Sequence, residues 1–409
     1  IDESRIIVGL DIGTFKVSVL VGLLPAVTGD AIEVIAVGSS PSKGMQRGVV
    51  TNIDYTVQAI EKAVLEAEAV IKRTIKSVYV SLSGSHIASE NSSGMVTLKG
   101  REVTEVDISN VIEAAKAINL PADRRLLHIL PQSYALDKHH GIKDPLGMSG
   151  MRLEVNVHLV SCKENAIQNI QKCVKMCGLA VDGLVSAPLA ASYSVLTEDE
   201  KELGVCMLDI GAGTTDIIVT AQSQVCYTAV LPVAGDQVTN DIALTLRTPI
   251  KHAEDIKTKY SCALASWVDE QEQIQVPNVG GRPPSSFPRY LLAQVSQARY
   301  AELFRIIEKD LKQNKVHDKI MGGGIVLTGG GSKMEGLVDL ATSIFSMPVR
   351  LGIPSGVNTN SMEHVIANNI YSVATGLLIY NSQQLPQGYK ASRRLFSFNS
   401  VCNWFRENF

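Results

Sequence analysis

Long apolar runs, export signals and blocks of like charge are missing from this 409-residue sequence. Because no uninterrupted apolar stretch is long enough to cross a bilayer, an integral membrane protein is not predicted. No signal peptide is visible, which argues against an exported protein. The net charge is only −3, and no long basic run precedes the extreme C-terminus, so no nucleic-acid partner is expected.

Cysteine pairs and metal-ligand clusters are also missing. The seven cysteines contain no CxxC pair and lie in apolar contexts, which favours a reduced, cytosolic protein over a disulfide framework. Cys173 and Cys177 are one helical turn apart on an apolar face, a position that fits a core better than a zinc site. The pair His139-His140 has no third ligand nearby and is expected to lie solvated in a polar loop.

Apolar residues make up 45% of the chain, enough to bury two sizeable cores, so two main domains are expected. The most informative stretch is 208–216, LDIGAGTTD, which lies between two apolar runs. It predicts two buried strands joined by a tight turn, in which Gly211 and Gly213 expose backbone N–H groups and Thr214 adds a hydroxyl donor. Such a nest binds phosphate, and a carboxylate such as Asp209 can hold hydrated Mg²⁺. For this motif alone, an ordinary hairpin turn is the alternative.

A second copy of the pattern lies near the N-terminus. Asp11, Gly13, Thr14 and Lys16 occur in the sequence DIGTFK, with a strand-like run on either side. Two such hairpins about half a chain apart predict a duplicated fold, with a phosphate held between the two halves.

A third glycine-bearing element follows the strand-like run 324–328, which ends in Gly329, Gly330 and Gly331. Together the three elements resemble the actin-like ATPase superfamily, in which they are two phosphate hairpins and an adenosine motif. The resemblance implies an α/β, actin-like (ribonuclease H-like) duplicated two-domain fold that binds ATP or ADP with Mg²⁺. It further implies that Asp11 and Asp209 hold the metal through water. The phosphate site that it implies consists of Gly13, Thr14, Lys16, Gly211, Gly213 and Thr214.

The order of elements departs from actin in the first half of the chain. The first elements follow the order of one actin half, with strand-like runs at 5–10, 16–24, 31–39 and 76–83. A helical run at 51–72, which Asn52 or Asp54 can cap, lies before the last of these strands. Residues 84–162 then predict a small inserted α+β unit, with a helix at 105–118 and strands near 94–98, 126–137 and 152–161. This unit resembles subdomain 1C of the FtsA family of bacterial cell-division proteins.

The resemblance implies four subdomains and a tail. The expected boundaries are 1–83 and 163–190 for subdomain 1A, 84–162 for 1C, 191–235 and 323–380 for 2A, 236–322 for 2B, 381–392 for a flexible linker and 393–409 for a C-terminal amphipathic helix. Later helices are expected at 163–178, 251–260, 289–314, 335–345 and 363–380.

One position indicates slow hydrolysis. The run 187–192, APLAAS, resembles the first connecting helix between the halves, where chaperone-like and MreB-like relatives carry Glu before the proline. This chain has Ala187 there. Loss of the group that orients the attacking water lowers the rate by something on the order of 10²- to 10⁴-fold. ATP binding with slow or absent hydrolysis is therefore expected, and no catalytic residue is assigned.

Three further residues are candidates for nucleotide binding. Gly235 opens a helix whose N-terminus can face phosphate. Glu254 and Lys257 are three residues apart and share a helix face. The resemblance implies that this pair contacts ribose and adenine, and a plain surface ion pair is the other interpretation.

The helix at 289–314 carries a charge within an apolar stripe. The stripe consists of Leu292, Val295, Leu303, Ile306 and Ile307. Arg299 falls in its middle with Glu302 beside it, and because burying an unpaired Arg is costly, Arg299 must be paired, snorkelling or available to a ligand. In the FtsA family, subdomain 2B receives the acidic C-terminal tail of FtsZ, which implies a role for Arg299 there. A structural ion pair is the alternative.

The segment 393–409 predicts an amphipathic helix. Its apolar face consists of Leu395, Phe398, Val401, Cys402, Phe405 and Phe409, with Trp404 at the flank. Aromatic residues next to Arg393 and Arg394 favour a helix that lies in a membrane interface over one that docks on its own domain. One copy is expected to bind lipid weakly, and many copies on one polymer firmly.

Over nearly the whole chain the resemblance implies a protein that assembles with itself into filaments and tethers FtsZ filaments to the cytoplasmic side of the bacterial inner membrane at the division septum. It also implies recruitment of later division proteins through the inserted subdomain. The alternatives are an actin-fold small-molecule kinase and a pilus-assembly ATPase of the same superfamily. The sequence reveals neither the carboxylate base nor the sugar pocket that a kinase needs, and a pilus protein would need no lipid-binding helix.

Overall fold

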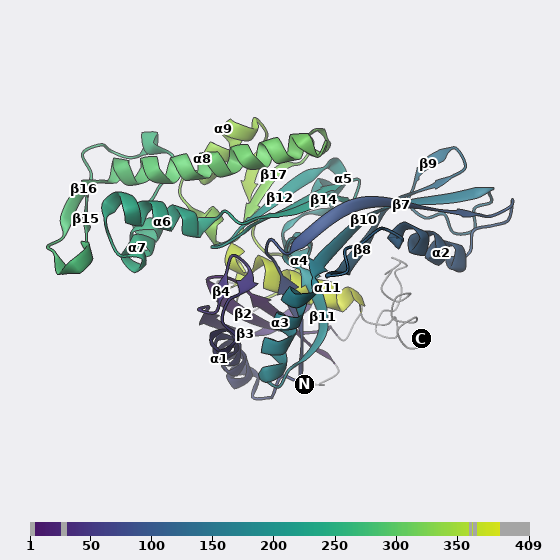
Figure 1. The fold of residues 1–409 in the computed structure, drawn as a ribbon, viewed down its shortest axis with the longest axis horizontal. Helices are drawn as coiled ribbons and strands as arrows, with labels where there is room; N and C mark the ends of the chain where they lie inside the picture. Colours follow the sequence, from purple (N-terminus) through teal and green to yellow (C-terminus); the bar gives the residue numbers. More distant parts are fainter. Residues whose placement is uncertain (1–4, 26–30, 360–361, 363–365, 385–409) are drawn as a thin grey trace.

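The computed structural model describes residues 5–25, 31–359, 362 and 366–384. These residues form two lobes, each around its own sheet, and a third sheet extends from the first lobe along the second (Figure 1). The predicted tail, 393–409, lies outside the described residues. Within them, no helix is both long and apolar enough to cross a membrane.

The first lobe is built on a sheet with the strand order β11-β6-β1-β2-β3-β19. Its strands are β1 (Ile6–Ile12), β2 (Lys16–Leu23), β3 (Ile32–Pro41), β6 (Ser77–Leu82), β11 (Ala180–Ser186) and β19 (Val357–Asn358). β1, β2 and β3 form an antiparallel meander, and β6 pairs with β1 in parallel. Helices α1 (Ile53–Ile71) and α3 (Glu164–Met176) pack their apolar residues against this sheet, whose central strands β1 and β2 are buried nearly throughout, whereas β3 alternates between buried and partly buried residues.

The second lobe repeats this topology. Its sheet has the order β14-β13-β12-β17-β18, with strands β12 (Val205–Ile210), β13 (Thr215–Ala221), β14 (Gln224–Leu231), β17 (Gly324–Thr328) and β18 (Val349–Leu351). Again three consecutive strands form an antiparallel meander, and the first of them pairs in parallel with a later strand. The predicted duplication is therefore confirmed.

Helices cover the far side of the second lobe. They are α6 (Gly235–Leu246), α7 (Ile250–Tyr260), α8 (Arg289–Gln313) and α9 (Leu337–Phe345), and the hairpin β15 (Gln273–Val276) and β16 (Ser285–Pro288) closes that end (Figure 1). The core is continuous from the sheet into these helices, because Leu208 on β12 and Phe304 on α8 belong to one buried cluster.

The inserted unit has its own sheet and core. The sheet has the order β7-β10-β8-β9, with β7 (Ile87–Thr97), β8 (Arg124–Leu136), β9 (His139–Ile142) and β10 (Arg152–Lys163), and helix α2 (Glu105–Lys116) packs on it. The strand predicted at 94–98 begins earlier, at Ile87. The prediction of a polar loop at His139-His140 was wrong, because Asp137 turns the chain with a φ of 56° and both histidines start an exposed edge strand.

Polar side chains join the insertion to β14 of the second lobe. Ser89 Oγ donates to the carbonyl of Thr228 at 2.7 Å, and Gln132 Nε2 donates to the carbonyl of Val225 at 2.9 Å. Buried His158 contacts Thr228 Oγ1 at 2.9 Å and Asn91 Oδ1 at 2.7 Å through its two ring nitrogens. The insertion therefore contacts both lobes, although the chain connects it only to the first.

Two helices connect the lobes, α4 (Ala187–Val195) and α11 (Ser372–Gln384). They cross where α11 has Gly376, whose missing Cβ would lie 1.8 Å from the carbonyl oxygen of Ala190. The helix predicted at 363–380 is interrupted within the described residues, because Ala367 and Asn368 are not helical and α11 begins at Ser372, after the 3₁₀ turn η7 (Asn369–Tyr371). It continues to Gln384, so the first four residues of the predicted linker are helical.

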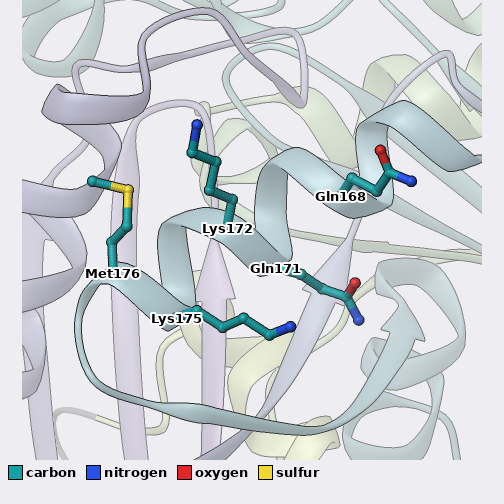
Figure 2. Close-up of a pocket in the computed structure, with 5 residues that line it drawn as sticks. All are labelled: Gln168, Gln171, Lys172, Lys175 and Met176. Atoms are coloured by element: carbon teal, nitrogen blue, oxygen red, sulfur yellow. The ribbon is translucent and has the colours of Figure 1, made fainter.

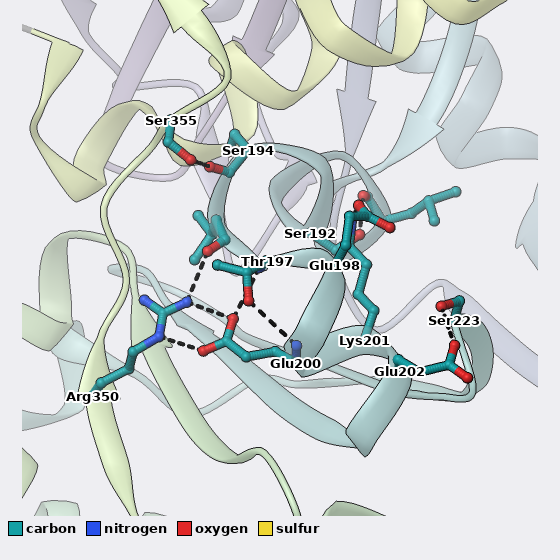
Figure 3. A network of polar contacts seen from close by, with 12 residues as sticks. Ser192, Ser194, Thr197, Glu198, Glu200, Lys201, Glu202, Ser223, Arg350 and Ser355 are labelled. Carbon is teal, nitrogen blue, oxygen red and sulfur yellow. Dashed lines mark hydrogen bonds and ion pairs between the residues drawn. The ribbon is translucent and has the colours of Figure 1, made fainter. Parts of the chain in front are cut away.

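A bidentate ion pair fixes the end of the first connecting helix. Arg350 on β18 donates to both carboxylate oxygens of Glu200 on α5 (Glu198–Leu203), at 2.5 and 2.7 Å (Figure 3). The same guanidinium donates to the carbonyl of Val195, the last residue of α4, at 2.9 Å. The end of α4 is therefore tied to the sheet of the second lobe.

Candidate nucleotide site

The two predicted phosphate hairpins have the same geometry and face each other. In the first, the N–H of Gly13 donates to the carbonyl of Lys16 at 3.0 Å, and in the second, the N–H of Gly211 donates to the carbonyl of Thr214 at 2.9 Å. A Cβ on Gly213 would lie 2.7 Å from Thr14 Oγ1 of the other lobe. The approach of the two lobes at this point therefore requires glycine.

A third turn, which the sequence did not reveal, lies between the hairpins. Strands β4 (Met45–Gln46) and β5 (Val49–Val50) are joined by Arg47 and Gly48, whose φ angles of 48° and 75° are those of a type I′ turn. The N–H of Gly48 donates to Thr14 Oγ1 at 3.1 Å. A Cβ on Gly213 would also come within 2.9 Å of the Arg47 backbone, so the turn contacts both hairpins.

The chain at the end of β6 holds one carboxylate from each lobe. Ser81 Oγ donates to Asp11 Oδ1 at 2.6 Å. Ser83 Oγ lies 2.8 Å from both carboxylate oxygens of Asp216, and 3.0 Å from Thr214 Oγ1. Sequence reasoning missed both serines, for which the only available signal was their spacing of two at a strand end.

The carboxyl groups of Asp11, Asp209 and Asp216 lie buried and close enough to affect one another's ionisation. The pKa of Asp209 is raised well above its usual value, first by burial and then by the charges of Asp216 and Asp11. Burial likewise raises the pKa of Asp11, and it raises that of Asp216 to about 7 although Ser83 and Thr214 donate to it. Such a cluster favours a bound cation. Within the described part of the chain, no group of three or more His, Cys, Asp or Glu residues is arranged to hold a metal ion.

Lys16 places a buried positive charge near the carboxylate of Asp11. Its Nζ is buried and has no hydrogen-bond partner among the described residues, and it lies 3.6 Å from the centre of the Tyr371 ring. Burial lowers its pKa to about 8, while the charge of Asp11 opposes this shift and that of Lys333 adds to it. Three unused N–H donors in a buried site fit a phosphate ligand.

The third glycine run packs directly on the second hairpin. Gly329 has a φ of 82°, and a Cβ there would lie 2.2 Å from Asp209 Oδ1. A Cβ on Gly331 would lie 2.9 Å from the carbonyl oxygen of Ile210, whereas one on Gly330 would meet only Ile370 at an ordinary 3.5 Å. Close packing therefore requires glycine at the first and third positions.

The N-terminus of α6 also reaches the second hairpin. The N–H of Gly235 donates to the carbonyl of Gly211 at 3.1 Å. Lys257 on α7 pairs with Glu254 at 2.7 Å and donates to the carbonyl of Gly235 at 3.1 Å. Both side chains are more than half-buried, so this pair differs from a plain surface ion pair and lies next to the phosphate hairpin.

Arg299 forms two ion pairs at a distance from the hairpins. Its guanidinium lies 2.6 Å from Asp241 on α6 and 2.6 Å from Glu302, and it is 29% exposed. Arg299 is therefore paired, which was one of the three arrangements expected for it beside snorkelling and availability to a ligand. The predicted stripe was partly wrong, because Ile306 is 40% exposed while Tyr300 is buried in its place.

A surface hollow on α3 lies elsewhere in the fold. It is lined by Gln168, Gln171, Lys172, Lys175 and Met176, all from one helix (Figure 2). None of the residues predicted for nucleotide binding lines it. The candidate site is therefore assigned from the convergence of the hairpins, the carboxylates and Lys16.

Comparison with known proteins decides the family. The chain is 50% identical over 401 residues to the cell division protein FtsA of Pseudomonas aeruginosa, covering 98% of this chain and 95% of that protein. The chain belongs to the FtsA family. It is also 43% identical to FtsA of Escherichia coli, over 99% of this chain and 96% of that protein. The family model for cell division protein FtsA matches residues 206–376, and a model for the SHS2 domain inserted in FtsA matches residues 84–161.

Solved structures identify the fold as actin-like. The type IV pilus biogenesis complex PilM–PilN aligns with a TM-score of 0.65 at 19% identity, over 91% of this chain and 98% of that chain. MreB5 of Spiroplasma citri bound to ADP aligns with a TM-score of 0.58 at 15% identity, over 93% of this chain and 97% of that chain. At such identities these likenesses show the fold alone. The predicted α/β, actin-like fold class and membership of the FtsA family are confirmed.

Proposed function

We propose that this FtsA-family protein binds ATP with Mg²⁺ between its two phosphate hairpins. The observation that carries the proposal is the buried ammonium of Lys16, which has three unused donors and interacts with the carboxylate of Asp11, itself close enough to Asp209 to raise the pKa of that carboxyl. The carboxylates would hold hydrated Mg²⁺, and the hairpin N–H groups, Thr14 and Thr214 would contact phosphate. Solved MreB5 structures of the same fold contain ADP or AMPPNP, which supports the choice of ligand.

Equilibrium titration with a fluorescent ATP analogue tests this proposal. Lys16→Gln removes the charge and is expected to weaken ATP binding at least tenfold, since charge-assisted hydrogen bonds to phosphate contribute about 1.5–3 kcal/mol. Lys172→Gln on α3 is the matched control, because it removes a lysine in the hollow away from the hairpins. Unchanged affinity of Lys16→Gln would remove Lys16 from the site.

The same site is proposed to hydrolyse ATP slowly. Ala187, buried at the start of α4, has no group that could orient a water molecule. Single-turnover measurement of phosphate release from bound ATP is expected to give a rate far below those of ordinary ATPases. A turnover above about one per second would contradict this assignment.

The proposed cellular role is to tether FtsZ filaments to the cytoplasmic face of the inner membrane at the septum. Filaments of this protein would present many copies of the segment 393–409, so that weak lipid binding by each copy becomes firm. Deletion of 393–409 is expected to abolish co-sedimentation with liposomes while ATP binding stays intact. Negative-stain imaging on a lipid monolayer with ATP tests filament formation.

Arg299 is proposed to take part in binding the acidic FtsZ tail. Its ion pairs with Asp241 and Glu302 leave it 29% exposed, so an incoming carboxylate would compete with these two partners. Arg299→Glu is expected to weaken binding of an FtsZ tail peptide, whereas Arg305→Glu, exposed on the same helix, is not. Equal affinity of both variants would favour a purely structural role for Arg299.

Later division proteins are proposed to bind the inserted subdomain.

A further inference from the structure

The ammonium of Lys16 lies against an aromatic ring. Its Nζ lies over the ring of Tyr371, 3.6 Å from the ring centre, and makes no hydrogen bond within the described residues. The two residues come from different parts of the chain, Lys16 from the start of β2 and Tyr371 from η7. A cation over an aromatic face is attracted by the quadrupole of the ring.

Other contacts hold η7 firmly against the third glycine run. Asn369 Nδ2 donates to Ser332 Oγ at 2.7 Å, and Ser372 Oγ donates to the carbonyl of Asn369 at 2.8 Å. The side chain of Ile370 faces Gly330, within 3.5 Å of where a Cβ would be. Tyr371 is 8% exposed and belongs to a buried cluster that also contains Leu20 on β2 and Leu378 on α11, so this packing and the contacts of η7 fix its place next to Lys16.

We propose that Tyr371 is a positioning residue for nucleotide binding: its ring holds the Lys16 ammonium in place while all three N–H donors remain free for phosphate. A carboxylate at this position would occupy those donors and neutralise the charge, and an aliphatic side chain would leave the ammonium without the attraction of an aromatic face. Tyr371 thus links the first hairpin to the adenosine motif of the other lobe. This inference rests on the proposed ATP binding.

Fluorescent ATP titration with Mg²⁺ tests the role of the ring. Tyr371→Phe keeps the aromatic face and is expected to bind ATP within about twofold of the wild type, whereas Tyr371→Leu is expected to weaken binding about 3- to 30-fold. In a Lys16→Gln background, Tyr371→Leu is expected to add little, because the residue acts through Lys16. Additive losses in this double-mutant cycle would overturn the proposal.

A second measurement separates positioning from packing if Tyr371→Leu fails to fold. Phenylalanine analogues carrying one to three ring fluorines at position 371 keep the shape of the ring and progressively weaken its negative face. Affinity for ATP is expected to fall with each added fluorine, while the urea unfolding midpoint stays constant. Affinity that is independent of fluorination would overturn the proposal. Failure of the wild-type protein to bind ATP would instead contradict the proposed function.

Discussion

At the scale of single residues, the hydroxyl of Ser83 is the contact that spans the lobes at the candidate site. Its Oγ lies 2.8 Å from both oxygens of Asp216, whose pKa is raised to about 7 mainly by burial. Hydrogen bonding favours the ionised carboxylate, so its loss is felt most where Asp216 is charged.

Ser83→Ala is therefore expected to lower the free energy of unfolding by about 1–3 kcal/mol above pH 8 and by less at pH 5, where Asp216 is protonated. Urea unfolding at the two pH values measures the difference. Ser223→Ala, which removes an exposed hydroxyl paired with Glu202, is the matched control and should cost under about 0.5 kcal/mol. An equal cost of Ser83→Ala at both pH values would contradict this role.

Buried His158 gives the fold a dependence on acid pH. Burial lowers its pKa to about 4, so between pH 6.5 and 4 the unfolded chain takes up a proton at this residue that the folded chain does not. Its contribution to stability is therefore fully present above pH 6.5 and is lost as the pH falls towards 4.

Between pH 7 and pH 5, the wild type is expected to lose about 1–2 kcal/mol more unfolding free energy than His158→Gln. Urea midpoints at the two pH values test this comparison, in which the other titrating groups largely cancel. His139→Gln, at an exposed position on β9, should keep the pH dependence of the wild type. The expectation fails if His158→Gln is as acid-sensitive as the wild type.

At the scale of elements, the crossing of α4 and α11 depends on one glycine. Alanine is about 1 kcal/mol better than glycine inside a helix, but a Cβ on Gly376 would lie 1.8 Å from the backbone oxygen of Ala190. Neither backbone can yield without separating the helices, so the steric cost outweighs the gain in propensity.

Gly376→Ala is expected to destabilise the protein by about 1–3 kcal/mol and to weaken ATP binding, because the two lobes would no longer approach correctly. Ser382→Ala, further along α11, is the control and should change stability by less than about 0.5 kcal/mol. Thermal unfolding with and without MgATP measures both effects. A stabilised Gly376→Ala would mean that helix propensity outweighs the clash.

Elements with a strong apolar period could be predicted from the sequence. β6 lies within one residue of the expected run, 76–83, at each end, and α1 lies within one or two residues of its expected run, with Asn52 as its N-cap. The strands β4 and β5 were missed because two residues are too few for a period. The buried face of α8 was misjudged because a wheel treats Ser296 and Tyr300 as polar, although both are buried against the core.

The candidate site was predictable where backbone conformation requires particular residues. Gly213 and Gly329 could be predicted because other atoms approach their backbones closely. The carboxylates of Asp11 and Asp209 could be predicted from their positions in the hairpin motifs. Contacts made by serine and aromatic side chains were not predictable. Ser83 and Tyr371 reach the site through the tertiary fold, and the only local signal was the spacing of two between Ser81 and Ser83 at a strand end.

At the scale of the whole molecule, the insertion is attached to the lobe that carries the second hairpin. Asn91 and Gln132 bond to each other and to β14, and β14 is hydrogen-bonded to β13, which carries Asp216. A displacement of the second hairpin is therefore transmitted to the insertion through one intervening strand.

MgATP is expected to slow amide exchange in β8 and β10 as well as in the hairpins. Gln132→Ala combined with Asn91→Ala should weaken this remote protection but keep it at the hairpins, as followed by hydrogen exchange and mass spectrometry, because only the contacts of Ser89 and His158 with Thr228 would remain. Ser92→Ala, whose hydroxyl bonds within the insertion to the carbonyl of Ala115, is the matched control. Remote protection that survives the double substitution would argue against transmission through these side chains.

The close backbone contact at Gly376 also determines how the lobes can move. Because the backbones of the two helices touch there with no side chain between them, we expect sliding of one helix along the other to be hindered and a rotation about that point to be the easier motion. A rotation about Gly376 would move each part of a lobe in proportion to its distance from that residue. A tilt that barely alters the hairpins would sweep the remote β15–β16 end through a wide arc (Figure 1).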